Sequence, residues 1–292
     1  EEARQVANSC YEGFSVKDLI REDGKVVGVR GVVEGEEREI RGRVVLGCDG
    51  FNSIVARKAG LYAHDSAHWV VAIRCYYEKV AELTDQIELH FVDEVLPGYF
   101  WIFPLEDGVA NVGIGMRHDA LKKRGVDLKV ALNEVISRSP FAHRFKDARP
   151  TEEPVGWNLP VGSTRRKSYG DGLLLLGDAA GLIDPFTGEG IGNALYSARF
   201  AVEAVVEAIE ADDYSGAFLK RYEDRLWDTI GDELATSTRM QRLGQYRPLL
   251  NFTINKAAHN DKVRDLICGM MANAVPKKQL TNPLFYLKLL FS

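Results

Sequence analysis

The chain has 292 residues, of which 46% are hydrophobic and 27% are charged, so it can bury a substantial core and divide into two lobes. Its formal net charge of −5 provides no basic surface for nucleic acid. No apolar run approaches the length of a membrane span. The cysteines show neither CxxC nor metal-ligand spacing, so we expect free thiols in a reducing compartment at Cys10, Cys48, Cys75 and Cys268.

The N-terminal part of the chain predicts a three-stranded meander. Its first residues are polar and look like the end of a helix. Asp23-Gly24 and Glu34-Gly35 are turn signals between runs of apolar and β-branched residues. We therefore expect strands at Val16–Ile20, Lys25–Val33 and Arg38–Leu46.

An aspartate-glycine pair follows the last of these strands. Asp49 and Gly50 come directly after an apolar run, and Ser53 is placed to cap a following helix. Ordinary turn chemistry explains such a pair when it stands alone. It becomes more specific beside a second glycine-aspartate pair, which occurs further along the chain.

A β-rich segment comes next. Alternating apolar residues and turn signals predict strands and then two helices. The expected strands are His68–Tyr77, Gln86–Val92, Gly98–Pro104 and Val109–Met116, and the expected helices are His118–Arg124 and Asp127–Arg138.

The strand at Gly98–Pro104 carries aromatic residues at every second position. Tyr99, Trp101 and Phe103 therefore share one face of the strand. Such a face either walls a large apolar cavity or packs the sheet against helices. We assign Tyr99 and Trp101 to a cavity because both have a polar edge as well as apolar area, and we expect Phe103 to serve mainly in packing.

The stretch from Gly172 to Gly192 organises the rest of the chain. Four consecutive leucines from Leu173 to Leu176 predict a strand that is buried on both faces. Gly177 and Asp178 follow at its carboxyl end, which is the edge where open α/β sheets bind ligands. The sequence therefore predicts a ligand site at this edge.

A turn and a glycine-rich helix start complete this stretch. Pro185 fixes the turn, and the segment from Gly188 to Gly192 opens a helix that runs to about Glu210. Such a helix start offers unpaired N–H groups and a partial positive charge. The residues expected on one apolar face of the helix are Ile191, Ala194, Leu195, Ala198, Ala201, Val202 and Val205.

The C-terminal region is predicted to be helical. The expected helices are Tyr214–Gly231, Leu234–Leu243, Pro248–Ala258 and Asp261–Ala274. The tail, Asn282–Phe291, is very apolar for a chain end. It can pack on the protein, close a substrate tunnel, meet another subunit or touch a bilayer surface.

The run Leu-Leu-Gly-Asp-Ala-Ala-Gly, followed by Asp-Pro-Phe-Thr-Gly-Glu-Gly-Ile, resembles the second FAD-binding fingerprint of the flavoprotein hydroxylase-like superfamily. The resemblance implies that Asp178 binds the ribityl chain of FAD and that Pro185 lies beside the isoalloxazine ring. It also implies that N–H groups around Gly188 to Ile191 face the flavin N1–O2 edge. Asp49 and Gly50 resemble a motif near the FAD pyrophosphate, although Ala56 stands where that motif often has arginine. The predicted cofactor-binding residues are Asp49, Gly50, Gly177, Asp178, Pro185, Gly188, Glu189, Gly190 and Ile191.

The Tyr-x-Trp-x-Phe-Pro run and the Gly-x-Gly at Gly113 and Gly115 resemble the geranylgeranyl reductase family. The match is close over residues 97–115 and 172–192 and looser elsewhere. It implies an FAD-dependent oxidoreductase that hydrogenates carbon-carbon double bonds in the prenyl chains of an isoprenoid lipid or pigment. The predicted substrate-binding residues are Tyr99, Trp101 and Phe103.

The expected fold is α/β (α+β), with an FAD-binding doubly wound domain that is N-terminally incomplete. We expect residues 1–60 and 166–211 to form the FAD-binding domain, 61–165 an inserted, mainly antiparallel substrate lobe, and 212–292 a helical region. A Gly-x-Gly-x-x-Gly unit, which the resemblance leads us to expect, does not occur in the sequence. Its absence through cutting, disorder or natural loss is left open.

Two alternatives to the reductase stay open. One is a flavin-dependent halogenase or monooxygenase of the same superfamily, and the other is a non-catalytic protein that binds prenyl lipids. No residue is assigned as the proton donor, and the electron donor is open among nicotinamide, ferredoxin, deazaflavin and a donor protein. We expect a cytoplasmic protein, with peripheral membrane contact as an alternative.

Overall fold

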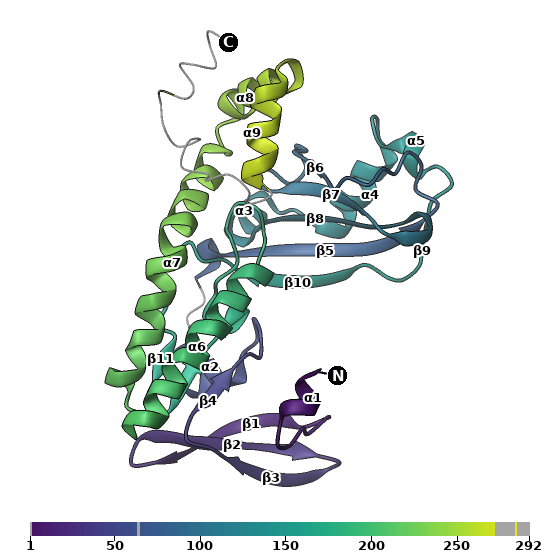
Figure 1. Ribbon diagram of the computed structural model, residues 1–292. Coiled ribbons are helices and arrows are strands. Elements are labelled where there is room, and N and C mark those ends of the chain that lie inside the picture. The colour runs from purple at the N-terminus through teal and green to yellow at the C-terminus, as the bar shows by residue number, and fades with distance from the viewer. Residues whose placement is uncertain (1, 63–64, 272–283, 285–292) are drawn as a thin grey trace. The chain divides into compact units, whose positions relative to one another are not determined.

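The computed structural model describes residues 2–62, 65–271 and 284, and it divides the chain into two compact units (Figure 1). Unit 1 comprises Glu1–Ala63, Arg165–Ile183 and Glu189–Asp232. Unit 2 comprises His64–Thr164, Asp184–Gly188 and Glu233–Ser292. The domains expected from the sequence are defined by their FAD-binding and substrate-binding roles, whereas these units are defined by compactness. The expected domain boundaries therefore stay a prediction.

Unit 1 begins with the short helix α1 (Glu2–Val6) and the meander β1-β2-β3, whose strands are β1 (Ser15–Glu22), β2 (Lys25–Val33) and β3 (Glu36–Arg41). Both predicted turns are confirmed. Asp23 and Gly24 have φ of 48° and 82°, and Glu34 and Gly35 have φ of 53° and 84°. Two successive residues with positive φ match the twist of antiparallel strands, which is why a glycine stands second in each turn.

A second sheet of unit 1 contains β4 (Val45–Gly47), β11 (Tyr169–Gly170) and β12 (Leu173–Leu175) in the order β11-β12-β4. β12 runs parallel to β4 and antiparallel to β11. All three residues of β12 are buried, which confirms the prediction of a strand covered on both faces.

The predicted strand Arg38–Leu46 is wrong, because the chain changes sheets within it. Gly42 N still donates to Val27 O in the meander, whereas Val45 N donates to Gly172 O beside β12. The structure therefore has two strands, β3 and β4, joined by a short connection.

The helices of unit 1 are α2 (Ile54–Lys58), the 3₁₀ turn η3 (Gly177–Ala180), α6 (Ile191–Ala211) and the first part of α7 (Gly216–Leu243). α7 is one continuous helix where the sequence predicted two. The predicted apolar face of α6 is wrong in part: Ile191 is 77% exposed and Leu195 is 67% exposed. The buried residues of α6 are Ser197, Phe200, Ala201, Ala204 and Ala208.

Unit 2 is built on an antiparallel sheet with the order β10-β5-β8-β7-β6, in which β9 also pairs with β5. The sequence predicted four of its strands, β5 to β8, and did not predict β9 and β10. Its strands are β5 (Trp69–Glu78), β6 (Glu88–His90), β7 (Tyr99–Pro104), β8 (Val109–Arg117), β9 (Arg149–Pro150) and β10 (Val155–Pro160), with the 3₁₀ turns η1 (Ser66–His68) and η2 (Glu106–Gly108) beside them.

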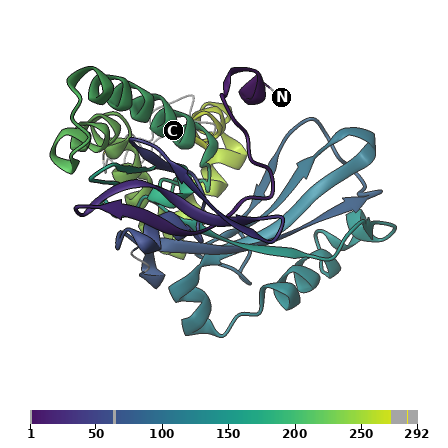
Figure 2. The ribbon, with the colours of Figure 1, turned by 90° about the horizontal axis from the view of Figure 1, so that it is seen from below.

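Three helices cover one face of this sheet, and Figure 2 shows them in teal along the strands. They are α3 (His118–Arg124), α4 (Leu128–Ser137) and α5 (Ala142–Phe145). Asp127 caps α4 by accepting hydrogen bonds from Lys129 N and Val130 N. The core beneath these helices includes Ile73, Phe100, Ile102, Val112, Ile114 and Leu132.

A smaller core lies among the C-terminal helices of unit 2, which include α8 (Arg247–His259) and α9 (Asp261–Met271). Met240 of α7 and Met270 of α9 pack with Phe186, Leu266 and Ile267. The expected end of the last helix at Ala274 lies outside the described residues, and so does the predicted tail except for Leu284. No helix within the described ranges is both long and apolar enough to cross a bilayer.

Candidate active site

The parallel pair in unit 1 brings two aspartate-bearing segments to one sheet edge. Leu175 of β12 lies opposite Gly47 of β4. Asp49 and Asp178 follow these residues within three positions, so both segments leave the sheet at its carboxyl end. This is the edge at which open α/β sheets bind ligands.

Asp49 organises the start of α2. Its Oδ1 accepts a hydrogen bond from Ser53 Oγ at 2.6 Å, and its Oδ2 accepts one from Val55 N at 3.1 Å. Ser53 in turn accepts from Ala56 N at 2.8 Å, which confirms the predicted N-cap. Both oxygens of Asp49 thus have a structural task, and its role near the FAD pyrophosphate, like that of Gly50, stays a prediction.

Asp178 has a different environment. The residue is half-buried, and this partial burial raises the pKa of its carboxyl group above the ordinary value. None of the described residues forms a hydrogen bond or an ion pair with its side chain. A methyl group built on Gly190 would stand 3.6 Å from Asp178 Oδ1, so the start of α6 lies close to this carboxylate. A half-buried carboxylate with no hydrogen-bond partner in the described part of the chain fits a ligand that donates hydrogen bonds.

Glycines bring the end of β12 and the start of α6 together. Gly177 has φ of +55°, and a methyl group there would press on Ala194 at 3.2 Å. Its N–H donates to Ser197 Oγ at 3.0 Å. Gly190 is the N-cap of α6 and supplies no side chain. The side chain that caps the helix is that of Glu189, because its Oε1 accepts a hydrogen bond from Gly192 N at 2.6 Å.

The segment Asp184–Gly188 is fixed within unit 2. Asp184 Oδ1 accepts from Phe186 N and Thr187 N at 2.9 and 2.8 Å, while Oδ2 accepts from Ser237 Oγ at 2.6 Å. Gln241 Nε2 donates to Pro185 O at 2.5 Å. The backbone around the predicted flavin contact Pro185 is therefore held by an Asx turn and by α7.

Tyr99 of β7 also holds this segment. Its hydroxyl donates to Thr187 O at 2.5 Å. A methyl group on Gly188, which has φ of +75°, would lie 2.9 Å from the same hydroxyl. Burial raises the pKa of Tyr99 to about 12, so the hydroxyl keeps its proton. The sequence assigned Tyr99 to a cavity wall, and that role stays a prediction. What the structure shows for Tyr99 is the hydrogen bond of its hydroxyl to Thr187 O.

The aromatic residues of β7 form a ladder on the face opposite the helices. The ring centroids of Tyr99 and Trp101 are 6.0 Å apart, as are those of Trp101 and Phe103. The predicted shared face is thereby confirmed. Trp101 Nε1 donates to Asn111 Oδ1 at 3.0 Å, and the indole lies over Gly113, where a methyl group would overlap it. The glycine is needed because the indole occupies the space of a side chain.

Sequence reasoning missed several residues of the site. Asp184 stands before Pro-Phe-Thr, and an Asx turn could have been anticipated there. No sequence signal marks Ser237 or Gln241, because each contacts its partner across a long stretch of chain. Asn111 begins the Asn-Val-Gly-x-Gly run, but its contact with Trp101 from the adjacent strand was not predicted.

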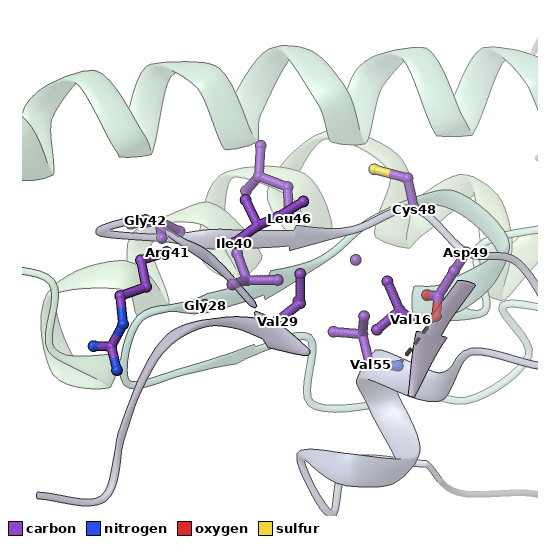
Figure 3. A pocket seen from close by; sticks show the side chains of 13 residues that line it. Val16, Gly28, Val29, Ile40, Arg41, Gly42, Leu46, Cys48, Asp49 and Val55 are labelled. Carbon is purple, nitrogen blue, oxygen red and sulfur yellow. Dashed lines mark hydrogen bonds between the residues drawn. The ribbon is translucent and has the colours of Figure 1, made fainter. Parts of the chain in front are cut away.

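A cavity of about 420 Å³ lies in unit 1 beside β4 (Figure 3). Its lining is mainly apolar, with Asp49 bonded to Val55 N at one side. β4 is an outer strand among the described strands of its sheet, and Leu46 is 41% exposed. The lining residues are Val16, Gly28, Val29, Ile40, Arg41, Gly42, Val44, Val45, Leu46, Gly47, Cys48, Asp49 and Val55.

Solved structures define the class of this fold. The chain is similar to the crystal structure of a geranylgeranyl bacteriochlorophyll reductase-like protein from Thermoplasma acidophilum, with a TM-score of 0.74 and 28% identity over 82% of this chain and 60% of that one. It is also similar to the flavin-dependent brominase Bmp2, with a TM-score of 0.68 over 88% of this chain and 65% of that one. At 21% identity the second likeness shows the fold alone. The fold is that of FAD-dependent oxidoreductases, with mixed α/β structure, antiparallel sheets and C-terminal helices.

Sequence relatives narrow the class. The family model of the geranylgeranyl reductase catalytic domain matches residues 69–152. Digeranylgeranylglycerophospholipid reductase 2 of Methanopyrus kandleri is 36% identical over 269 residues, which are 89% of this chain and 66% of the relative. The Methanocaldococcus jannaschii reductase is 41% identical over 65% of this chain and 48% of the relative. The chain belongs to the geranylgeranyl reductase family, and it spans about half to two thirds of the length of these relatives.

Proposed function

We propose that this chain provides most of an FAD-dependent reductase that hydrogenates prenyl double bonds of an isoprenoid glycerophospholipid. The observation that carries the proposal is the ladder of Tyr99, Trp101 and Phe103, which stands on the sheet face opposite α3, α4 and α5, within the segment matched by the family model. The names of the relatives in turn specify digeranylgeranylglycerophospholipid as their substrate.

Asp178 and the start of α6 fit FAD. The Asp178 carboxylate, with no hydrogen-bond partner among the described residues, suits the hydroxyl groups of a ribityl chain. Gly190 caps α6 without a side chain, so the partial positive charge of the helix start can face a polar ring edge, although Glu189 already accepts the Gly192 N–H. Reduced FAD, when bound, supplies the hydride for the double bond. Gly177 contributes indirectly, since it allows β12 to end against α6.

The residues of unit 2 orient the lipid and exclude water. An isolated alkene is a poor electrophile, so the reaction depends on holding the double bond in a dry, fixed position. Trp101 is held by Asn111 and provides a rigid apolar surface. Tyr99 provides a second aromatic ring, while its hydroxyl fixes the segment that contains Pro185. No described side chain is assigned as the proton donor.

The test compares one residue from each unit. Asp178→Ala should lower the flavin bound per chain by more than tenfold, because the carboxylate that receives the ribityl hydroxyls is gone. Trp101→Ala should lower turnover of a geranylgeranyl lipid by more than tenfold while flavin content stays within twofold. Flavin absorbance and product analysis by mass spectrometry measure the two quantities. Asp228→Ala, which removes an exposed aspartate of unit 1, is the matched control and should change neither.

The same measurements separate the alternatives. Protein that takes up no flavin but binds the lipid supports the non-catalytic carrier. Turnover that yields a halogenated or oxygenated product supports the other flavoenzyme classes. Equal losses of flavin in the Asp178 and Trp101 variants contradict the division of roles proposed here.

A further inference from the structure

Strand β10 presents its apolar side chains to the face that the unit 2 helices leave free. Gly156 pairs with Ile73, a residue of the core beneath α3–α5. The residues of β10 on this core face are therefore Gly156, Asn158 and Pro160, while Val155, Trp157 and Leu159 lie on the opposite face. A half-buried strand normally does the reverse and turns its apolar residues toward the core.

Trp157 shares a row of the sheet with Tyr99. Trp157 pairs with Ala72, Ala72 pairs with Gly115, and Gly115 pairs with Tyr99. Directly paired residues stand on the same face, so both aromatic side chains rise from one surface. Neighbouring strands are about 4.8 Å apart, which puts the Cα atoms of Trp157 and Tyr99 about 14 Å apart. Between them lie Ala72 and Gly115, whose side chains are only a methyl group and a hydrogen atom.

Ala72 and Gly115 form a strip of small residues, and the rows on either side of this strip each contain an arginine. Arg74 lies in the row of Val155 and Trp101, where it is paired with Glu152 and lies 4.5 Å from the Tyr76 ring centroid. Arg117 lies in the row of Leu159 and is paired with Asp119 at 2.5 Å. The strip itself is therefore apolar, and a charged side chain lies in the row on each side of it.

Exposure points to a missing apolar contact along β10. Trp157 is 56% exposed and Val155 is 46% exposed. Outer strands usually carry charged residues that discourage association. Single exposed apolar residues need no explanation. Here, however, the exposed Val155 and Trp157 lie on one face of the strand beside the half-buried Leu159. Trp157 also faces Tyr99 of the aromatic ladder across the small residues Ala72 and Gly115.

We propose that Trp157, flanked by Val155 and Leu159, is a specificity-determining contact for the prenyl chain, on the opposite side of Ala72 and Gly115 from Tyr99. The proposal rests on the proposed function and extends the substrate contacts from β7 to β10. The six residues of β10 span about 20 Å, so an extended prenyl chain can lie along the strand. The flat indole accepts branched isoprene units, and Ala72 and Gly115, which lie between Trp157 and Tyr99, carry no polar side-chain group and so favour hydrocarbon.

The test uses the full 292-residue chain and geranylgeraniol as the probe. Trp157 is the exposed tryptophan among the described residues, so acrylamide should quench its fluorescence and saturating lipid should shield it. Trp157→Ala should weaken lipid binding about tenfold, since the contact loses an indole face. Trp157→Phe should keep binding within twofold and lose the shielding signal. Asn158→Ala, on the same strand but the opposite face, is the control and should stay within twofold of wild type.

Each outcome decides one proposal. If wild-type protein binds geranylgeraniol and Trp101→Ala weakens binding while Trp157→Ala does not, the role of Trp157 is overturned and the proposed function stands. If the wild-type chain binds no prenyl lipid, the proposed function fails, and this inference with it. Shielding that follows protein concentration instead of lipid shows that a second copy of the chain covers β10, which also overturns it. Should Trp157→Ala fail to fold, the shielding in wild type and its loss in Trp157→Phe still decide.

Discussion

β12 of unit 1 and β7 of unit 2 use their residues in opposite ways. All residues of β12 are buried, so the strand can place a functional group only beyond its end, where Asp178 stands. β7 alternates: Phe100 and Ile102 are fully buried, whereas Tyr99 and Trp101 occupy the other face. A strand that is covered on both faces can place functional side chains only beyond its end, whereas a strand with only one face in the core can place them along its length.

This difference separates stability from function in unit 1 and combines them in unit 2. In β12 the leucines maintain the core and the following aspartate is available for a ligand. In β7 and β8 the proposed substrate residues also pack on one another and on glycines. Substitutions in the two regions should therefore give distinguishable results.

The largest effect is expected at Leu174, which is fully buried in β12. Leu174→Ala should lower the free energy of unfolding by about 3 kcal/mol, because it removes buried methyl groups and leaves a cavity. Urea denaturation measures the change. Leu46→Ala, at the position of β4 that pairs with Leu174 but is 41% exposed, is the control and should cost less than about 1 kcal/mol. Equal costs at the two positions would show that β12 is not the centre of its core.

A smaller effect is expected at Gly113, where the sheet and the ladder meet. Gly113→Ala should cost about 2 kcal/mol, because the new methyl group overlaps the Trp101 indole and approaches Ile73 O. Near-ultraviolet circular dichroism should report a changed indole environment. Gly115→Ala is the matched control, since its closest contact would be Ala72 Cβ at 3.2 Å. An unchanged indole signal in Gly113→Ala would contradict the placement of Trp101 over β8.

The smallest effect is expected at Tyr99, and it depends on pH. Tyr99→Phe removes the hydrogen bond to Thr187 O and should cost about 1 kcal/mol near neutral pH. The pKa of Tyr99 is raised to about 12 in the folded chain, so the folded state disfavours the tyrosinate. Its contribution to stability is complete below the ordinary pKa of 10 and is lost as the pH rises from there through 12.

Urea denaturation at about pH 8 and about pH 11 measures this contribution. Wild-type protein should lose more stability between the two values than Tyr99→Phe does, and the difference isolates Tyr99 from the other tyrosines. A tyrosine of unit 1 with a raised pKa, Tyr222, donates to Leu175 O and provides the comparison as Tyr222→Phe. Identical losses in wild type and Tyr99→Phe would rule out the buried hydroxyl as their source.

The parts of the fold that the sequence predicted depend on local signals. The hairpin turns at Asp23-Gly24 and Glu34-Gly35 and the cap at Ser53 require particular residue types at particular positions, so they could be recognised directly. The buried face of α6 could not, because alanine and valine surround that helix on most sides. α7 was predicted as two helices around Gly231, but the helix continues there and packs Trp227 against that glycine.

The candidate site divides in the same way. Asp178 was found because a buried strand ends just before it. The shared face of Tyr99 and Trp101 follows from the period of a strand. The contact between Tyr99 and Thr187 joins residues 88 positions apart, and no local pattern encodes it. The same holds for Gln241, which reaches Pro185 from a helix that resembles any other amphipathic helix.

Glu189 changes how the start of α6 treats charge. Its carboxylate already accepts the Gly192 N–H, so the helix carries its own counter-anion at the positive end of its dipole. An electron-rich group that binds there meets a carboxylate that already accepts a hydrogen bond from the first turn of the helix. The Glu189 carboxylate consequently reduces the positive potential that the start of α6 offers to a ligand.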